Sequence, residues 1–79
     1  MKQEELTPIH SHIQGTYRHY KGNLYRVLAV GRHSETLEEM VVYESLTHPG
    51  EVWVRPASMW EETVLVDGVQ ILRFTPVDL

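Results

Sequence analysis

Apolar and polar residues alternate along several short segments of the chain, and turn-forming residues separate these segments. The segments with this pattern are residues 16–20, 24–30, 40–46, 51–55, 63–66 and 69–74. The alternation is strictest in residues 51–55, where Val52 and Val54 share one face and Trp53 and Arg55 share the other. Strand-forming residues with a period of two predict five to six short antiparallel strands.

Glycine, proline and asparagine mark the expected turns. They occur in Lys21-Gly22-Asn23 and in His48-Pro49-Gly50. Asp67-Gly68 is a strong signal for a two-residue hairpin. Residues 56–60 interrupt the alternation and predict a single helical turn. The only candidate for a longer helix is residues 33–45, which we predict to be extended because two consecutive β-branched residues interrupt a helical pattern there.

Together these features predict an all-β fold, a small SH3-like barrel with one short helical turn. An OB-like barrel and an open roll are the alternatives. A closed barrel is favoured because it leaves no exposed sheet edge. We expect residues 1–14 to form an N-terminal tail, from which Ile9 and Ile13 could dock, and residues 15–79 to form the single barrel domain.

The expected core consists of apolar residues of these strands and of the helical turn. They are Val27, Leu28, Val30, Val42, Val52, Val54, Met59, Val64 and Ile71. We also expect Trp60 to fill the core from the helical turn. In a chain of 79 residues the core is small, so each large apolar side chain contributes a considerable share of the buried surface.

Composition narrows the function classes. The chain has no cysteine, which excludes disulfides, thiolate catalysis and cysteine-ligated metals. It shows no secretory signal and no apolar run of membrane length, so we expect a cytoplasmic protein without a membrane partner. Residues 15–34 carry four basic residues and no acid, whereas residues 35–79 carry nine acids against two arginines. The net charge of -4 makes nucleic acid the less favoured partner.

The densest polar string is His33-Ser34-Glu35-Thr36. His33 could act as a base or ligand contact, Glu35 could orient it, and Ser34 could donate a hydrogen bond. In the alternative interpretation, Ser34 and Thr36 only cap backbone groups of a loop. His10 and His12 could both contact a metal ion, but no second spaced pair accompanies them. We therefore predict no metal and no cofactor.

Aromatic and basic residues form a second candidate group. Trp53 and Arg55 leave the same strand face, and an arginine there can hold a carboxylate or phosphate beside the indole. Tyr20 could lie over the mouth of the barrel. Alternatively, Trp53 belongs to the core and Arg55 pairs with a glutamate, for example Glu35, Glu61 or Glu62. His19 is expected to be a surface or partly buried hydrogen-bonded residue.

Four separated strings resemble the bacterial family known as domain of unknown function 1653. They are Gly15-Thr16-Tyr17-Arg18-His19-Tyr20-Lys21-Gly22-Asn23-Leu24-Tyr25-Arg26-Val27-Leu28, His33-Ser34-Glu35-Thr36, Val41-Val42-Tyr43, and Trp53-Val54-Arg55-Pro56 followed by Met59. The resemblance runs from about residue 15 to residue 74. The chain departs from the family pattern at Trp60, where phenylalanine is usual, and at Leu72, where proline is common. The resemblance implies a short cytoplasmic domain and brings no activity or catalytic residue with it.

We interpret the chain as a non-enzymatic binding module for a small anionic ligand or a peptide. The expected ligand-binding residues are Tyr20, His33, Ser34, Glu35, Trp53 and Arg55. One alternative is binding of RNA or single-stranded nucleic acid by stacked tyrosines and arginines. The other is a small enzyme that uses His33 and Glu35. The sequence leaves the oligomeric state open.

Overall fold

The computed structural model describes residues 7–78, which form seven strands and one short helix. In chain order these are β1 (Gly15–His19), β2 (Leu24–Arg32), β3 (Glu39–Ser45), β4 (Val52–Pro56), α1 (Ala57–Trp60), β5 (Thr63–Val66), β6 (Val69–Leu72) and β7 (Phe74–Val77). The all-β class and the single helical turn are therefore confirmed. Within residues 7–78, no helix has the length and apolar character needed to cross a membrane.

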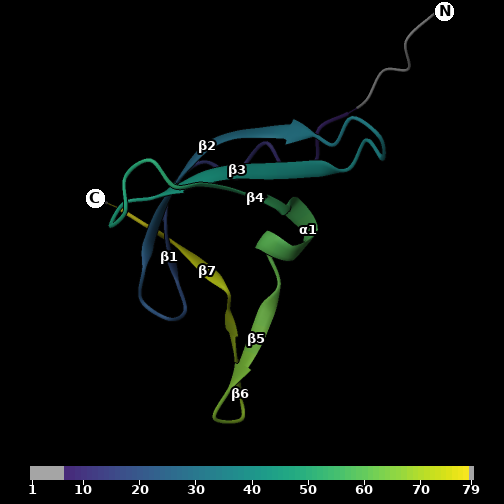
Figure 1. Ribbon diagram of the computed structural model, residues 1–79. Coiled ribbons are helices and arrows are strands. Elements are labelled where there is room, and N and C mark those ends of the chain that lie inside the picture. The colour runs from purple at the N-terminus through teal and green to yellow at the C-terminus, as the bar shows by residue number, and fades with distance from the viewer. Residues whose placement is uncertain (1–6, 79) are drawn as a thin grey trace, which may run out of the picture.

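Five strands form one antiparallel sheet in the order β4-β3-β2-β1-β7, and β5 and β6 form a separate hairpin (Figure 1). The last strand predicted from the sequence is divided at Arg73, so that β6 belongs to the hairpin and β7 returns to pair with β1. No strand joins β4 to β7, because β5 and β6 pair only with each other. The expected SH3-like barrel closure is therefore not found, and the curled sheet keeps two edges.

The turns form where the sequence predicts them. At the hairpin between β5 and β6, Asp67 has φ 51° and Gly68 has φ 80°. Positive φ at both central residues is the geometry of a type I′ turn, which matches the twist of the flanking strands. The β1–β2 turn is held by the Gly22 amide, which donates to the His19 carbonyl at 2.7 Å. These local signals needed no tertiary contact to be recognised.

In β3 and β4 the core lies on the opposite strand face from the one expected, whereas Val27 and Val30 of β2 pack against it as expected. The core consists of Ile13, Tyr17, Val41, Tyr43, Ala57, Trp60 and Phe74, and Tyr25, Val27 and Val30 pack against it. In β3 the buried residues alternate as Glu39, Val41, Tyr43 and Ser45. Val42 therefore lies on the outer face of the sheet, where it is only half-buried.

Five residues of the expected core are exposed, and that prediction is wrong for them: Leu28, Val52, Val54, Met59 and Ile71. A period of two places valines on one face of β4 but does not say which face meets the core. In β2 the pairing register with β3 shifts between Val27 and Ala29. This β-bulge changes the phase of the strand, so that Val27 and Val30 both reach the core and Leu28 does not.

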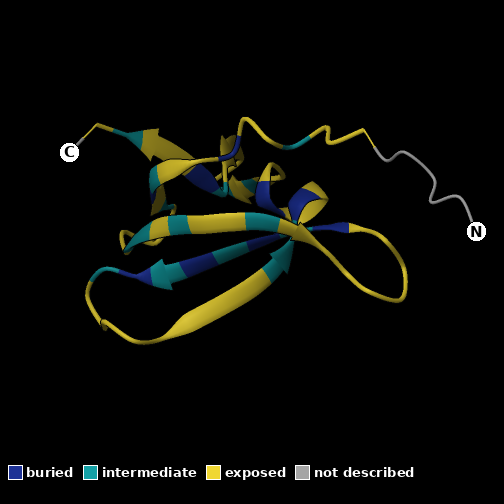
Figure 2. Ribbon diagram, turned by 90° about the horizontal axis from the view of Figure 1, so that it is seen from above, coloured by how far each residue is buried: buried dark blue, intermediate teal, exposed yellow. Residues whose placement is uncertain are grey.

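Aromatic rings occupy the centre of the core. Trp60 stacks on Phe74 with ring centroids 3.8 Å apart and planes inclined by 5°. Tyr17 and Tyr43 meet the Trp60 ring edge-on at 5.2 and 4.8 Å. The expectation that Trp60 fills the core is confirmed, and Figure 2 shows buried positions on α1 beneath the sheet. Ile13 completes the core from the N-terminal segment, whereas Ile9 is exposed.

Candidate anion-binding site

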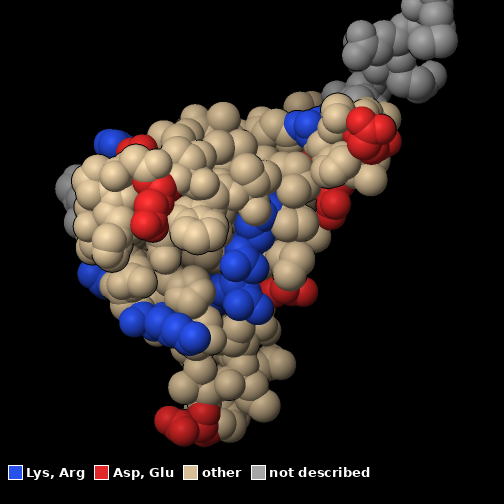
Figure 3. Space-filling view, viewed as in Figure 1, with Lys and Arg blue, Asp and Glu red and all other residues tan. Residues whose placement is uncertain are grey.

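Three cationic side chains surround His19, and His19 and Arg55 also lie against the ring of Phe74. We call Arg55, Arg73, His19 and Lys21 the basic cluster. The three cations lie close enough to His19 to act on its imidazole electrostatically. Figure 3 shows Lys and Arg atoms as a stripe in the middle of one face, over the region of β4 and the junction between β6 and β7. The cluster thus joins residues from three separate parts of the chain.

Each member is fixed by local structure. Arg55 lies opposite Val41 in the β3–β4 pair and therefore shares the core-facing side of the sheet. Its guanidinium carbon lies 5.8 Å from the centroid of the Phe74 ring, within the range of a cation–π contact. Arg73 interrupts the chain between β6 and β7. Its amide donates to the Glu62 carbonyl and its carbonyl accepts from the Tyr20 amide, both at 2.9 Å.

His19 lies opposite Phe74 in the β1–β7 pair, with ring centroids 5.0 Å apart. Partial burial lowers the pKa of His19 below its ordinary value of 6.5, and the positive charges of Arg73, Arg55 and Lys21 lower it further. The imidazole is therefore neutral at pH 7. The contribution of the three cations shows that positive charge surrounds the ring.

Several donors in this region lack a partner. Within residues 7–78, three buried side-chain N–H groups have no acceptor: Arg55 Nε, Arg73 Nε and Trp60 Nε1. Arg73 pairs with Glu62 at 4.0 Å, and Arg55 forms no ion pair with any carboxylate of the described residues. The sequence-based alternative, in which Arg55 pairs with Glu35, Glu61 or Glu62, is therefore wrong. Buried donors left unpaired are costly, and an oxyanion could accept from them.

Of the residues predicted to bind a ligand, Arg55, Tyr20 and Trp53 lie at or beside the basic cluster. Tyr20 contacts Arg73 through its amide, and the Lys21 ammonium lies 5.8 Å from its ring. Trp53 is two residues from Arg55 on the same strand face and is half-exposed, so it is not the core residue of the alternative interpretation. Its position leaves the indole accessible beside the cluster.

His33, Ser34 and Glu35 lie elsewhere, in the exposed loop between β2 and β3. His33 Nδ1 accepts from the amides of Glu35 and Thr36, and the Ser34 hydroxyl donates to the Glu35 carboxylate. The Thr36 hydroxyl accepts from the Glu38 amide, so the capping interpretation holds for Thr36, whereas His33 and not Ser34 supplies the other backbone cap. Glu35 contacts the His33 ring through its amide, while its carboxylate accepts from Ser34. No hydrogen bond or ion pair of the described residues joins the loop to Arg55.

The sequence analysis missed Arg73 and Phe74 as site residues and gave His19 only a structural role. A lone Arg-Phe pair near the end of a strand carries no functional signal in one sequence. Only the return of β7 to β1 brings Phe74 against His19 and places Arg73 behind Tyr20. The grouping of these residues therefore depends on tertiary structure and cannot be read from any local sequence pattern.

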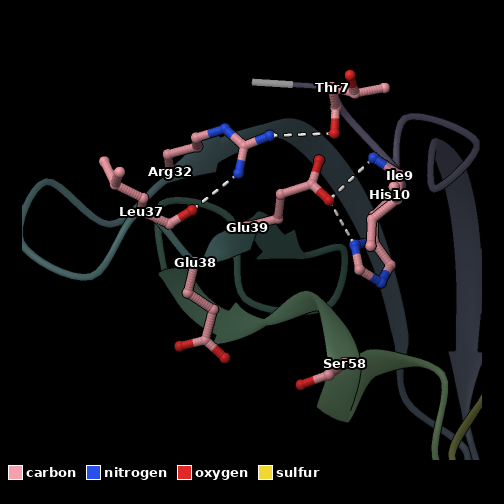
Figure 4. Close-up of a pocket in the computed structure, with 8 residues that line it drawn as sticks. All are labelled: Thr7, Ile9, His10, Arg32, Leu37, Glu38, Glu39 and Ser58. Atoms are coloured by element: carbon pink, nitrogen blue, oxygen red, sulfur yellow. Dashed lines mark hydrogen bonds and ion pairs between the residues drawn. The ribbon is translucent and has the colours of Figure 1, made fainter. Parts of the chain in front are cut away.

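A second polar group attaches the N-terminal segment (Figure 4). His10 Nδ1 donates to the buried carboxylate of Glu39 at 2.6 Å, and the Ile9 amide donates to the same oxygen at 3.1 Å. Burial acts to raise the pKa of Glu39, but these hydrogen bonds outweigh it and hold that pKa below its ordinary value. The adjoining cavity of about 270 Å³ is lined by Thr7, Ile9, His10, Arg32, Leu37, Glu38, Glu39 and Ser58.

His12 pairs with Glu61 beside this attachment. Nevertheless, no group of three or more potential ligands within residues 7–78 is arranged to hold a metal ion. The carboxylates here accept hydrogen bonds from the histidine rings, so the rings serve to fix the segment on the domain. This cluster is the less favoured candidate for ligand binding because its donors and acceptors already satisfy each other.

Comparison with known proteins places the chain in a family. Residues 15–76 match the family described as protein of unknown function, DUF1653. The chain belongs to the DUF1653 family. It is also similar to a crystal structure of a DUF1653 protein from Bordetella bronchiseptica, with 38% identity, a TM-score of 0.73, and coverage of 81% of this chain and 85% of that one. No curated protein matches the chain.

The span of the DUF1653 match separates the two polar groups of this structure. All four residues of the basic cluster lie inside residues 15–76, and so does Phe74. His10 and His12 lie outside it. The basic cluster therefore belongs to the part of the chain that matches the family, whereas the histidines that attach the N-terminal segment lie outside that part.

Proposed function

We propose that this DUF1653 domain is a non-enzymatic binding module that takes an anionic group, a carboxylate or a phosphate, at the basic cluster. Arg55 and Arg73 would hold the anion, with His19 and Lys21 beside it and Tyr20 and Trp53 at its margin. The anion could belong to a small molecule or to a peptide. Placement of this module in the cytoplasm, as the sequence predicts, is part of the proposal.

The observation that carries the proposal is the set of buried, unpartnered N–H groups on Arg55, Arg73 and Trp60. Each buried donor without an acceptor costs about 1–3 kcal/mol relative to a satisfied one. Burial and the two nearby guanidinium groups both disfavour protonation of His19 and lower its pKa. Such a cost is expected at functional sites, where a ligand supplies the missing charge and acceptors.

The chemistry of the cluster favours oxyanions over other ligands. Guanidinium groups bind carboxylate and phosphate through paired hydrogen bonds, and these charge-assisted bonds are stronger than neutral ones. A bound anion would also stabilise the protonated form of His19 and raise its pKa. The imidazole would then change from a neutral neighbour to a third cationic donor. Binding should therefore tighten as the pH falls from 7 towards 6.

The test is a titration of the full chain with inorganic phosphate, sulfate and acetate at constant ionic strength, followed by NMR. We expect saturable shifts of the His19 imidazole and the Trp60 indole signals, with an upward shift of the His19 pKa. Sulfate isolates the effect of His19 because its own charge is constant between about pH 5 and 8. Arg55→Gln should abolish the saturable shifts.

Arg26→Gln is the matched control, because Arg26 is exposed and already paired with Glu44 at 3.0 Å. It should respond to anions as the parent does. Shifts that grow linearly without saturation, or that persist in Arg55→Gln, would contradict the site. A single-stranded oligonucleotide that binds where the small anions do not, with affinity falling steeply as salt rises, would favour the nucleic-acid alternative.

A further inference from the structure

The strand β4 forms a free edge of the five-stranded sheet. Among the described residues it pairs with β3 only, and in Figure 2 it is the lowest strand of the sheet, exposed over the first part of its length. Val52, Trp53 and Val54 are 53%, 51% and 59% exposed. Natural edge strands are normally protected by lysine, proline or a bulge. In β4 the only such residue is the terminal Pro56, and residues 52–55 contain no lysine, proline or bulge.

The hydrogen bonds of β4 leave a regular set of groups unpaired. The Ser45 amide donates to the Glu51 carbonyl at 3.2 Å, which puts Glu51 at a hydrogen-bonded position of the β3–β4 ladder, while the Glu51 amide donates to His48 in the turn. Hydrogen-bonded pairs alternate with non-bonded pairs in an antiparallel ladder. Trp53 and Arg55 therefore direct their backbone groups towards β3. The N–H and C=O groups of Val52 and Val54 point away from the sheet, as donors and acceptors for another strand.

The sequence of this edge is complementary to itself. If two copies of residues 51–55 pair antiparallel about Trp53, Val52 of each copy lies opposite Val54 of the other. Glu51 then lies opposite Arg55, so that unlike charges face each other and no like charges do. This register also brings the outward-pointing groups of Val52 and Val54 into hydrogen-bonded pairs. A shift towards Pro56 would lose a donor, because proline has no N–H.

We propose that a second copy of this chain pairs along β4, so that two five-stranded sheets become one continuous sheet with Trp53 at the two-fold axis. The pairing is isologous, the commonest arrangement in homo-oligomers. Main-chain hydrogen bonds supply the affinity and the alternating side chains supply the register, as in other cases of strand addition. Because only one short strand per copy is involved, the dimer is weak and concentration-dependent. It requires no anion, but it shares Arg55 and Trp53 with the proposed anion site, because Glu51 of the second copy lies opposite Arg55.

Sedimentation equilibrium of the full chain, from about 1 µM to about 1 mM, tests the pairing. The parent should pass from monomer to dimer within this range. Val54→Lys should weaken the dimer about tenfold or more, because the two-fold axis places the lysine in the interface twice. Val69→Lys is the matched control, since Val69 is also 59% exposed but lies in the β5–β6 hairpin. It should dimerise as the parent does.

A cross-linking experiment tests the register. The chain has no cysteine of its own, so a single introduced thiol can cross-link only between copies. Trp53→Cys places two cysteines opposite each other on the axis, in a non-hydrogen-bonded pair. Their Cα atoms would be about 4.5 Å apart, a distance that suits a disulfide. Val52→Cys places its two thiols on residues that are not opposite each other. Under mild oxidation, Trp53→Cys should form the covalent dimer much faster than Val52→Cys.

A parent chain that stays monomeric over the whole concentration range would overturn the proposal. An extended segment of another protein would then be the expected partner of the β4 edge. Equal dimer affinities for Val54→Lys and Val69→Lys would overturn it as well, since the contact would then lie elsewhere. Equal cross-linking of the two cysteine variants would refute the register. Circular dichroism and urea unfolding of each variant establish that a lost dimer does not reflect a lost fold.

Discussion

His19 shows how the surroundings of one side chain set its behaviour in this domain. Its imidazole is partly buried, faces the Phe74 ring and lies in the field of Arg73, Arg55 and Lys21. All of these influences oppose protonation, so the folded protein holds the ring neutral more strongly than the unfolded chain does. The same residue therefore reports both on the stability of the domain and on the charge of the cluster.

This lowered pKa predicts a pH dependence of stability. Between the folded pKa of His19 and 6.5, the unfolded chain binds more protons than the folded one, so the free energy of unfolding rises with pH. The contribution is fully present above 6.5 and is lost as the pH falls through the folded pKa. Urea unfolding between pH 5 and 7 should show a smaller slope for His19→Gln than for the parent. Parallel slopes would mean that His19 titrates normally.

At the scale of the elements, the neighbouring strands β3 and β4 differ in how deeply their valines are buried. Val41 of β3 is fully buried between Tyr43 and the helix region, whereas Val54 of β4 lies on the outer face at the sheet edge. Both are valines in short strands of similar pattern. Each Å² of apolar surface that is removed from water stabilises the fold by about 25 cal/mol. Only the buried valine therefore stabilises the fold appreciably.

We therefore expect Val41→Ala to lower the free energy of unfolding by about 2 kcal/mol or more, from the lost transfer energy and the cavity that remains. Val54→Ala should change it by less than about 0.5 kcal/mol. The measurement is urea unfolding at a protein concentration at which the parent is monomeric. A larger loss for Val54→Ala than for Val41→Ala would show that the assigned faces of the sheet are reversed.

For the whole molecule, the N-terminal segment contributes more to stability than its polar composition indicates. Ile13 is 2% exposed in the core, and the His10–Glu39 hydrogen bond fixes the chain just before it. A domain of this size buries a limited core and has a total stability of only about 5–15 kcal/mol. One isoleucine supplied from outside the family-defining residues is therefore a considerable part of the total.

Ile13→Ala should destabilise the protein by about 2–5 kcal/mol, because it leaves a cavity among the aromatic residues of the core. Ile9→Ala is the matched control, since Ile9 is 69% exposed and should have an effect below about 0.5 kcal/mol. Thermal and urea unfolding of both variants test the difference. Equal and small effects would mean that the segment does not contribute to the stability of residues 15–79.

The sequence by itself determined the local features of this protein. Turn residues such as Asp67-Gly68 fix the backbone through their own conformational preferences, and alternation fixes which residues of a strand share a face. For this reason the all-β class, the turns and the single helical turn ending in the buried Trp60 were predictable. Arg55 was singled out because it shares a strand face with Trp53, and its role in binding an anion stays a prediction.

Tertiary structure alone decided which face of each strand is buried and which strands meet. The bulge at Leu28 shifts the phase of β2, and alternation in β4 fits either choice of inner face. The sheet stays open because β5 and β6 pair with each other instead of closing it. Likewise, Arg73 and His19 join Arg55 only because β7 returns to β1, a pairing between residues more than fifty positions apart that no local pattern specifies.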